Sequence, residues 1–363
     1  MAYTEINKPN KHFDLKLFTG NGSTQSITGM TLQPDWVWIK GRESVDNHVL
    51  VDSSRGVNKY LSSDANTAET DNSNSITAFG SEGFSVGSLN ANNKNTEEHV
   101  AWCWKANGGT TVSNDDGSIT STVQANTTAG FSIVTYTGTG SAATVGHGLG
   151  ATPKMIWVKR RSTAEAWGVY HGSTINVSDP ETDYWELDKA DGTADNANRW
   201  NDTAPTSTVF SIGTHASVND SASGTHTYVA YCFAQVKGYS HFGAFTGVDN
   251  NADGPMIYTG FRPRFVIIKR SDGSDSWTMS DRERSRTEKD ATVLVGGNPI
   301  KGKLEADTGD AEVTTASAID YYSTGFKIRD TDGIHGGQAN EYIYMAWADM
   351  PTVGSNGVIA LAR

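Results

Sequence analysis

The sequence predicts an all-β protein made of three tandem, homologous β-sandwich domains of the jelly-roll kind. A seven-residue motif that begins with proline and ends with lysine occurs at residues 34–40, 153–159 and 263–269. Each copy is rich in β-branched or aromatic residues and is bounded by turn-forming residues, which indicates a strand. No stretch of helical periodicity is longer than two turns, so strands are expected nearly throughout.

Both faces of the motif are apolar. In the first copy Trp36 and Trp38 alternate with Val37 and Ile39. A strand that is buried on both sides has this pattern. The leading proline stands where a strand can begin without losing a ladder hydrogen bond. We therefore expect the tryptophans of these motifs in the core.

The distance between copies favours whole domains over short structural repeats. Lys40, Lys159 and Lys269 end the three copies and are separated by 119 and 110 residues. Solenoids and propellers repeat every 20–50 residues, whereas about 100–150 residues form one domain. Insertions between the shared landmarks change the spacing, and loops tolerate such insertions.

These landmarks give the expected domain boundaries. The three repeats are predicted at residues 13–105, 128–236 and 242–349. The remaining segments are an N-terminal docking segment, a linker and a C-terminal tail, at residues 1–12, 106–127 and 350–363. Residues 117–123 alternate like a strand, so the linker also has a packed alternative. The short junction at residues 237–241 predicts tight packing of the second and third repeats.

A last landmark contains both cysteines of the chain. Residues 100–104 match residues 229–233, and we match residues 345–349 to them in the third repeat. Cys103 and Cys232 then occupy equivalent positions in separate domains, and Ala348 stands there in the third. Reduced, buried cysteines are expected, which is consistent with assembly in a reducing cytoplasm.

Composition excludes several partners. The net charge is −12 and the pI is about 5.2, whereas proteins that bind duplex nucleic acid carry basic stripes. No run of 18 apolar residues is present, so no membrane insertion is expected. The N-terminus has no apolar signal-peptide core.

Motifs of catalysis are not found in the sequence. The nine histidines do not show metal-ligand spacing, and nucleophile elbows, phosphate loops and dinucleotide fingerprints are lacking. We therefore predict that the protein is not an enzyme. Glu181, Asp183, Glu186 and Asp188 crowd one segment, which we interpret as an acidic solvated loop. The alternative is the carboxylate pair of a glycan depolymerase.

An aromatic insertion in the second repeat is the candidate glycan-binding site. It contains Tyr184, Trp185 and Trp200, with Glu186 beside them. Aromatic rings can stack on a pyranose face while polar groups bind its hydroxyls. The alternative is that these rings anchor a long loop to its own domain.

One loop has the opening of a calcium site. Asp249, Asn251 and Asp253 stand in an Asp-x-Asn-x-Asp-Gly pattern, but the twelfth position is Gly260 and not a glutamate. A plain turn is therefore favoured, with calcium as the alternative, and no other cofactor is expected.

Several segments resemble a family of bacteriophage virion proteins that is frequent in marine phages. They are residues 6–9, 17–25, 33–40, 50–56, 100–105, 130–138 and 145–149. The resemblance implies concanavalin-like jelly rolls and a phage tail fibre or structural protein, and it implies no catalytic residues. The third repeat departs from the pattern at residues 280–284.

We therefore predict a non-enzymatic virion protein, assembled in the cytoplasm of the bacterial host. A tail fibre or tail-associated protein that binds a host-surface glycan is favoured. The alternatives are a capsid decoration or head-fibre protein that stabilises the shell, and the depolymerase. Its partners would be other virion proteins of the tail or capsid. A homo-oligomer is expected, with a trimer favoured, and weak binding would gain from several copies on one particle.

Overall fold

The computed structural model describes residues 5–173, 179–221, 225–248, 253–284, 298–314, 319–329 and 336–349. Within these ranges the protein is all-β, with many antiparallel sheets and helices of at most four residues. The predicted fold class is confirmed at this level. In the same ranges, no helix is both long and apolar enough to cross a membrane.

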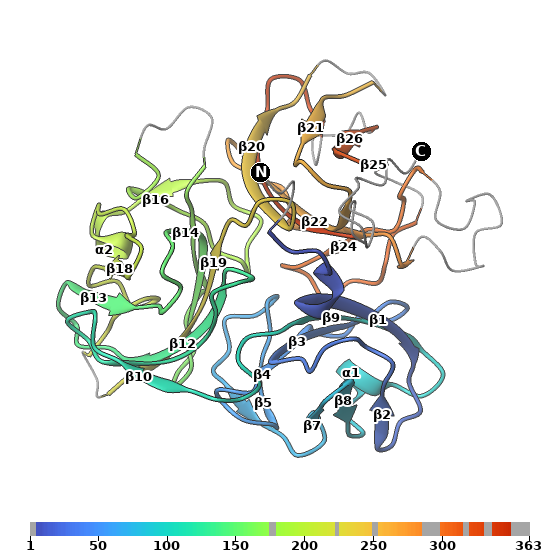
Figure 1. Ribbon diagram of the computed structural model, residues 1–363, viewed down its shortest axis with the longest axis horizontal. Coiled ribbons are helices and arrows are strands. Elements are labelled where there is room, and N and C mark those ends of the chain that lie inside the picture. The colour runs from blue at the N-terminus through green and yellow to red at the C-terminus, as the bar shows by residue number, and fades with distance from the viewer. Residues whose placement is uncertain are drawn as a thin grey trace.

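Three large sheets form the frame of the molecule (Figure 1). The first has the order β1-β9-β3-β4-β5-β6, from β1 (Phe13–Thr19), β3 (Trp36–Gly41), β4 (Val49–Asp52), β5 (Lys59–Leu61), β6 (Thr70–Asp71) and β9 (Glu98–Trp104). The second has the order β10-β11-β12-β19-β14-β15, from β10 (Val112–Asn114), β11 (Ser121–Asn126), β12 (Phe131–Thr137), β14 (Pro153–Arg160), β15 (Gly168–His171) and β19 (Thr227–Ala234). The third has the order β20-β27-β22-β23-β24, from β20 (Ser240–Thr246), β22 (Pro263–Arg270), β23 (Thr278–Asp281), β24 (Leu304–Glu305) and β27 (Glu341–Ala348).

Each large sheet has a small sheet, and together they form what we call a unit. The small sheets consist of β2 (Gln25–Ile27), β8 (Gly83–Val86) and β7 (Ile76–Gly80) in the first unit, β13 (Ala143–Gly146) and β18 (Val209–Ile212) in the second, and β21 (Met256–Tyr258), β26 (Gly325–Ile328) and β25 (Ile319–Tyr322) in the third. The second unit also carries the strand pair β16 (Asp183–Tyr184) and β17 (Ala194–Asp195). Short helices are η1 (Pro9–Lys11), α1 (Asn90–Asn93) and α2 (Ala197–Trp200).

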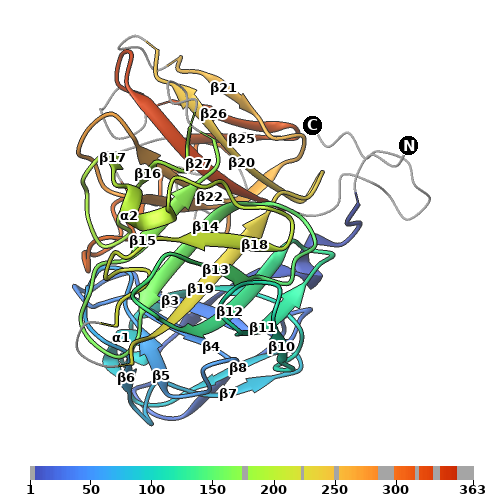
Figure 2. The ribbon, with the colours of Figure 1, turned by 90° about the vertical axis from the view of Figure 1, so that its left-hand side faces the viewer.

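One face of each large sheet packs on its own small sheet, so each unit is β-sandwich-like. In the first unit Val37 and Ile39 of β3 contact a cluster that includes Phe84 and Val86 of β8. The second and third units have corresponding clusters. In the side view the third unit lies above the first (Figure 2).

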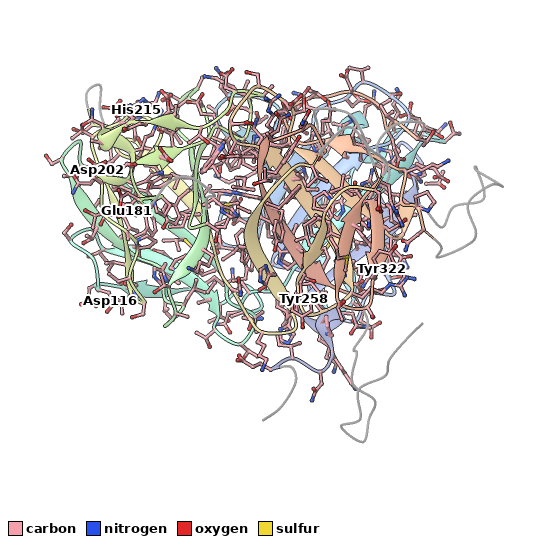
Figure 3. The ribbon with its side chains drawn as sticks, turned by 90° about the horizontal axis from the view of Figure 1, so that it is seen from above. Asp116, Glu181, Asp202, His215, Tyr258 and Tyr322 are labelled. Atoms are coloured by element: carbon pink, nitrogen blue, oxygen red, sulfur yellow. The ribbon has the colours of Figure 1, made fainter. Side chains whose placement is uncertain are left out.

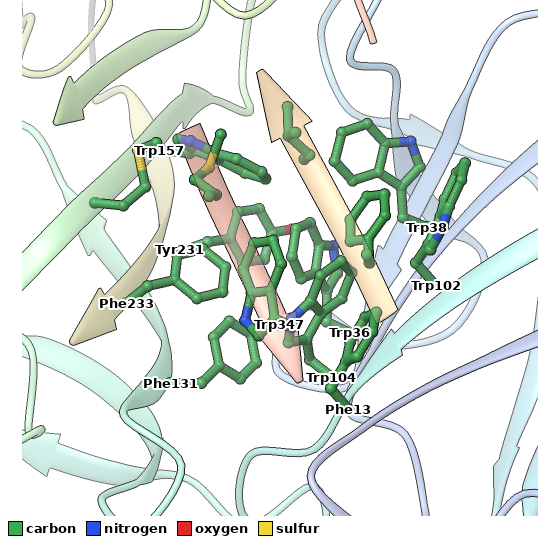
Figure 4. Packing of buried hydrophobic residues seen from close by; sticks show 14 of the residues in the cluster. Phe13, Trp36, Trp38, Trp102, Trp104, Phe131, Trp157, Tyr231, Phe233 and Trp347 are labelled. Atoms are coloured by element: carbon green, nitrogen blue, oxygen red, sulfur yellow. The ribbon is translucent and has the colours of Figure 1, made fainter. Parts of the chain in front are cut away.

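The other faces of the three large sheets meet in one shared aromatic core (Figure 4). The Trp36 ring of the first unit stacks on Tyr231 of the second at 4.3 Å between centroids. Phe233 of the second unit lies 5.6 Å from Trp347 of the third, and Phe13 of the first unit lies 5.8 Å from the same tryptophan. The motif strands are therefore buried on both faces, as predicted, because one face belongs to the unit and the other to the whole molecule.

Strand pairing corrects one sequence match. Cys103 pairs with Val37, Cys232 with Ile156, and Ala346 with Val266. The third-repeat counterpart of the cysteines is therefore Ala346 and not Ala348. A shift by two residues keeps every side chain on the same face, so the alternating pattern could not reveal it. Both cysteines are free and buried, as expected.

The segments outside the predicted repeats also pack. The predicted linker, residues 106–127, contributes β10 and β11 to the second large sheet, so its packed alternative holds. In the predicted docking segment, Ile6 is buried in the shared core and the Glu5 N–H donates to the Lys237 carbonyl. The predicted C-terminal tail, residues 350–363, lies outside the described residues.

Candidate functional site

The same type of hydrogen bond crosses all three boundaries between units. We call these boundaries the first seam (first and second units), the second seam (second and third) and the third seam (third and first). A ring nitrogen eight residues after the motif lysine donates to a backbone carbonyl of the neighbouring unit. The pairs are Trp167 Nε1 and Ser62 at 2.9 Å, Trp277 Nε1 and Glu186 at 3.0 Å, and His48 Nε2 and Glu305 at 3.0 Å. The units therefore close into a ring.

Two of the three motif lysines also belong to the seams. Lys159 Nζ donates to the Asn66 carbonyl of the first unit at 3.1 Å, and Lys269 Nζ donates to the Ala190 carbonyl of the second unit at 2.7 Å. Burial lowers the pKa of both lysines to about 8. Their bonds to carbonyls on both sides of a seam indicate a structural role.

A cavity of about 690 Å³ lies at the first seam and is the candidate site. Its lining includes Asn66 from the first unit and Tyr184, Glu186, Lys189, Arg199 and His215 from the second. Ligand sites of this size combine a hydrophobic surface with a few placed polar groups. Here one aromatic ring stands among several hydrogen-bonding side chains.

Arg199 fixes the geometry of this cavity. It lies on helix α2, whose N-cap residue Asn196 accepts a hydrogen bond from the Asn198 N–H. The Arg199 guanidinium lies 3.9 Å from the centroid of the Tyr184 ring and donates to Glu186 at 2.6 Å. It also donates to the Ser217 hydroxyl at 2.6 Å. The arginine is only 2 % exposed, so these contacts hold Tyr184 and Glu186 in place.

Glu186 is a carboxylate in this setting. Burial alone would raise its pKa, but hydrogen bonds from Lys189 and Arg199 lower it overall. A general acid must hold a proton near neutral pH, which a lowered pKa opposes. The arrangement suits a hydrogen-bond acceptor for hydroxyl groups better than an acid catalyst.

The four residues that we proposed from the sequence for glycan binding lie in two different environments. Tyr184 and Glu186 line the cavity. Trp185 is fully buried in the shared core, and Trp200 is 2 % exposed in the core of the second unit. The expectation that these two tryptophans stack on a sugar is therefore corrected, because neither indole presents a face to a ligand. They anchor the insertion, which was the alternative.

The other acids of this segment have structural surroundings. Asp188 accepts the Trp167 N–H at 2.8 Å. Asp183 is buried, and burial together with the nearby Asp195 raises its pKa. Glu181 is half-buried in the second unit, where Figure 3 labels it. None of these three acids lines the cavity, whose carboxylates are Glu165, Glu186 and Asp191.

The calcium-like loop is described only in part. Asp249 and Asn251 lie outside the described residues. Asp253 is described, and its carboxylate pairs with Lys327 at 2.5 Å and with Arg329 at 3.3 Å. Within the described ranges, no group of three or more His, Cys, Asp or Glu side chains is placed to hold a metal ion.

Sequence reasoning missed Arg199, Lys189, His215 and Asn66 as cavity residues. Asn66 belongs to a different unit, so only the closed ring brings it to the cavity. Arg199 had a local signal, since Asn196 is a good N-cap residue directly before it. Burial and the charge of Arg199 lower the pKa of His215, so this ring is neutral near pH 7.

Comparisons with known proteins place the chain in a family without a described activity. No curated protein matches it, and no solved structure matches it. One family model matches residues 8–351, and its description is a domain of unknown function, DUF7483. Because this match covers nearly the whole sequence, the chain belongs to the DUF7483 family.

Proposed function

We propose that this chain is a non-enzymatic bacteriophage virion protein, of the tail fibre or tail-associated kind, that binds a host-surface glycan at the first seam. The cavity carries the binding part of this proposal, because it joins the half-buried Tyr184 ring to several hydrogen-bonding groups. The virion part rests on the resemblance of the repeated motifs to phage virion proteins. The finer fold, three tandem concanavalin-like jelly rolls, is part of the same proposal.

The chemistry of the cavity fits a saccharide. A pyranose offers an apolar face of C–H groups and an edge of hydroxyls, which an aromatic ring and polar side chains recognise together. Tyr184 supplies the ring, Glu186 accepts hydrogen bonds, and Lys189 and Asn66 donate them. The cavity volume of about 690 Å³ is typical of ligand sites and is enough for about one or two sugar rings.

The surrounding contacts favour binding without a large ordering cost. Arg199 holds both Tyr184 and Glu186, and the Glu165 N–H of the second unit donates to the Asn66 carbonyl of the first at 2.8 Å. A site that is rigid before binding loses less conformational freedom on binding. The proposed affinity per site is weak, and several copies on one particle, as in the favoured homotrimer, would raise the avidity.

A glycan-binding assay with matched variants tests the proposal. Purified protein is screened against surface polysaccharide of susceptible bacteria, and the dissociation constant is measured by calorimetry. Tyr184→Ala removes the stacking ring and should weaken binding by roughly tenfold. Tyr258→Ala is the control, because Tyr258 is 64 % exposed and lies on the third unit (Figure 3).

Two results would contradict the glycan site. One is equal binding by the Tyr184 variant, the Tyr258 variant and the unchanged protein. The other is no binding to any polysaccharide of a susceptible strain, which would favour the capsid decoration alternative. Release of reducing ends during the assay would instead favour the depolymerase.

A further inference from the structure

The second seam differs from its two counterparts in one charged position. At the third seam the Arg42 guanidinium lies between Glu98 of its own unit and Glu312 of the neighbouring unit, at 2.5 Å from each. At the first seam Arg161 binds Glu69 of the neighbouring unit through two nitrogens, at 2.8 and 3.0 Å. Both seams thus contain an arginine that is held by carboxylates.

Backbone hydrogen bonds identify the corresponding residues at the second seam. Arg42 N–H donates to the Glu98 carbonyl at 2.8 Å, Arg161 N–H to Thr227 at 2.8 Å, and Ser271 N–H to Glu341 at 2.7 Å. The carbonyl oxygens of Arg42, Arg161 and Ser271 each accept a backbone N–H of the neighbouring unit. These donors are Glu312, Glu69 and Thr193, respectively. Ser271 therefore stands where the other seams have arginine, and Thr193 where they have glutamate.

Glu341 supplies a carboxylate at the second seam, although the arginine is missing there. It corresponds to Glu98, because each pairs with the threonine that ends the first strand of its unit, Thr246 and Thr19. No hydrogen bond or ion pair of the Glu341 side chain is found within the described residues. Burial and the nearby Asp272 raise the pKa of Glu341, as expected for an acid that has no countercharge.

A cavity occupies the position of the missing arginine. It has a volume of about 470 Å³, and Thr193, Ser271, Asp272 and Glu341 are among its lining residues. Gly192 also lines it, and a Cβ there would stand 2.8 Å from the Ser271 carbonyl oxygen. The backbones of the two units therefore approach closely while the side chains leave space between them.

We propose that this cavity binds an organic cation, with a guanidinium or primary ammonium group placed where Arg42 and Arg161 place theirs. The Glu341 carboxylate would accept from the cation as Glu98 accepts from Arg42. The Thr193 hydroxyl offers a second acceptor, and Asp272 lies at the exposed rim. Asp272 already pairs with Arg270 at 2.8 Å, so Glu341 supplies the unbalanced charge.

The net charge of −12 favours the approach of cations. This cavity adjoins the proposed glycan cavity, because Gly192 and Thr193 line both, but its carboxylate, Glu341, belongs to the third unit and does not line the glycan cavity.

A pair of isosteric ligands tests the charge requirement. Butylguanidinium and butylurea have nearly the same shape, and only the first is a cation. Ligand-observed NMR with the full chain should show binding of butylguanidinium and none of butylurea. Equal binding of both would overturn the proposal, since it would show an apolar or adventitious site.

Two variants test the position. Ser271→Arg restores the residue found at the other two seams, and it should abolish butylguanidinium binding and raise Tm. Glu341→Gln should weaken binding by roughly tenfold, because it removes the charge of the acceptor. Each variant is checked for an unchanged circular dichroism spectrum. Unaltered binding in a folded Ser271→Arg protein would overturn the site.

A third ligand distinguishes the natural source of the cation. N-acetylarginine methylamide carries the same head group on a peptide backbone. If it binds more tightly than butylguanidinium, the site accepts an arginine side chain of another protein. If it binds more weakly, the site accepts a small free cation.

Discussion

His48 has a buried ring whose two nitrogens have fixed roles. Its Nδ1 accepts a hydrogen bond from the Trp38 indole at 2.8 Å, and its Nε2 donates to the Glu305 carbonyl across the third seam at 3.0 Å. A second proton on Nδ1 would face the Trp38 N–H. Burial and the charge of Lys40 lower the pKa of His48 to about 3, so the folded protein keeps this ring neutral.

This neutral histidine predicts a pH dependence of stability. The pKa of His48 is lower in the folded state than the value of about 6.5 expected in the unfolded state. The unfolded state therefore binds more protons below pH 6.5, and its protonation destabilises the fold as the pH falls. Between pH 7 and pH 5 the unchanged protein should lose about 2 kcal/mol of unfolding free energy through this group. Urea unfolding of the protein and of His48→Gln at both pH values measures this difference.

A neighbouring acid, Asp64, changes the stability with pH in the opposite direction to His48, so the two contributions must be separated. Burial raises the pKa of Asp64 to about 6, so its protonation favours the folded state as the pH falls from 6 towards 4. Both proteins retain Asp64, and the difference between them isolates His48. Equal pH dependence in the two proteins would contradict a buried neutral His48.

At the scale of elements, Asp35 joins the first unit to the segment that leads into the second. Its carboxylate accepts the backbone N–H groups of Ala106, Gly108 and Gly109 at 2.8, 2.9 and 2.8 Å. It also accepts the Ser53 hydroxyl at 2.9 Å. These four bonds explain why residues that the sequence assigns to a linker have a defined course.

Asp35→Ala should therefore loosen this connection. Hydrogen exchange of the amides of Ala106 and Gly108 is expected to accelerate by roughly tenfold or more, because each loses its acceptor. The Gly109 N–H also donates to Gln124 Oε1 at 2.8 Å, so its exchange should change less. Exchange in β3 and β9 should change less. Asp115→Ala, at an exposed acid of the same segment, is the control. Protection that persists in Asp35→Ala would show that other contacts fix the segment.

The strands were predictable, and their partners were not. Period-two alternation in Trp36-Val37-Trp38-Ile39 was enough to predict burial on both faces. It could not show that one face packs against two other units, because long-range packing leaves no local pattern. Trp185 illustrates the same limit: its backbone exchanges hydrogen bonds with Val169 at 2.9 and 3.1 Å. This pairing continues the second sheet and turns the indole into the shared core, whereas the surrounding sequence has the composition of a loop.

Only part of the candidate site could be predicted from the sequence, for a related reason. Tyr184 and Glu186 were found because they are aromatic and acidic residues in one insertion. Arg199 was not considered, although it organises both of them. The cation cavity could be recognised only from the closed ring of units, because only matching positions at three seams reveal that Ser271 replaces an arginine.

At the scale of the whole molecule, the ring gives one chain three similar units around a common core. Sequence differences between the units are therefore differences between seams. The first seam has the polar cavity assigned here to a glycan, and the second has the cavity assigned to a cation. The first and third seams keep arginine–glutamate pairs. Such a frame can hold sites at fixed positions while loops vary, which fits the virion adhesin that we propose.

Immunogold electron microscopy of intact phage particles, with an antibody raised against this chain, tests the central claim most directly. The predicted result is gold at the tail of particles from a phage that encodes the chain, and none on particles of an unrelated phage. Gold over the head would favour capsid decoration over adhesion. Particles that carry no label, although the antibody detects the protein in infected cells, would contradict the virion function.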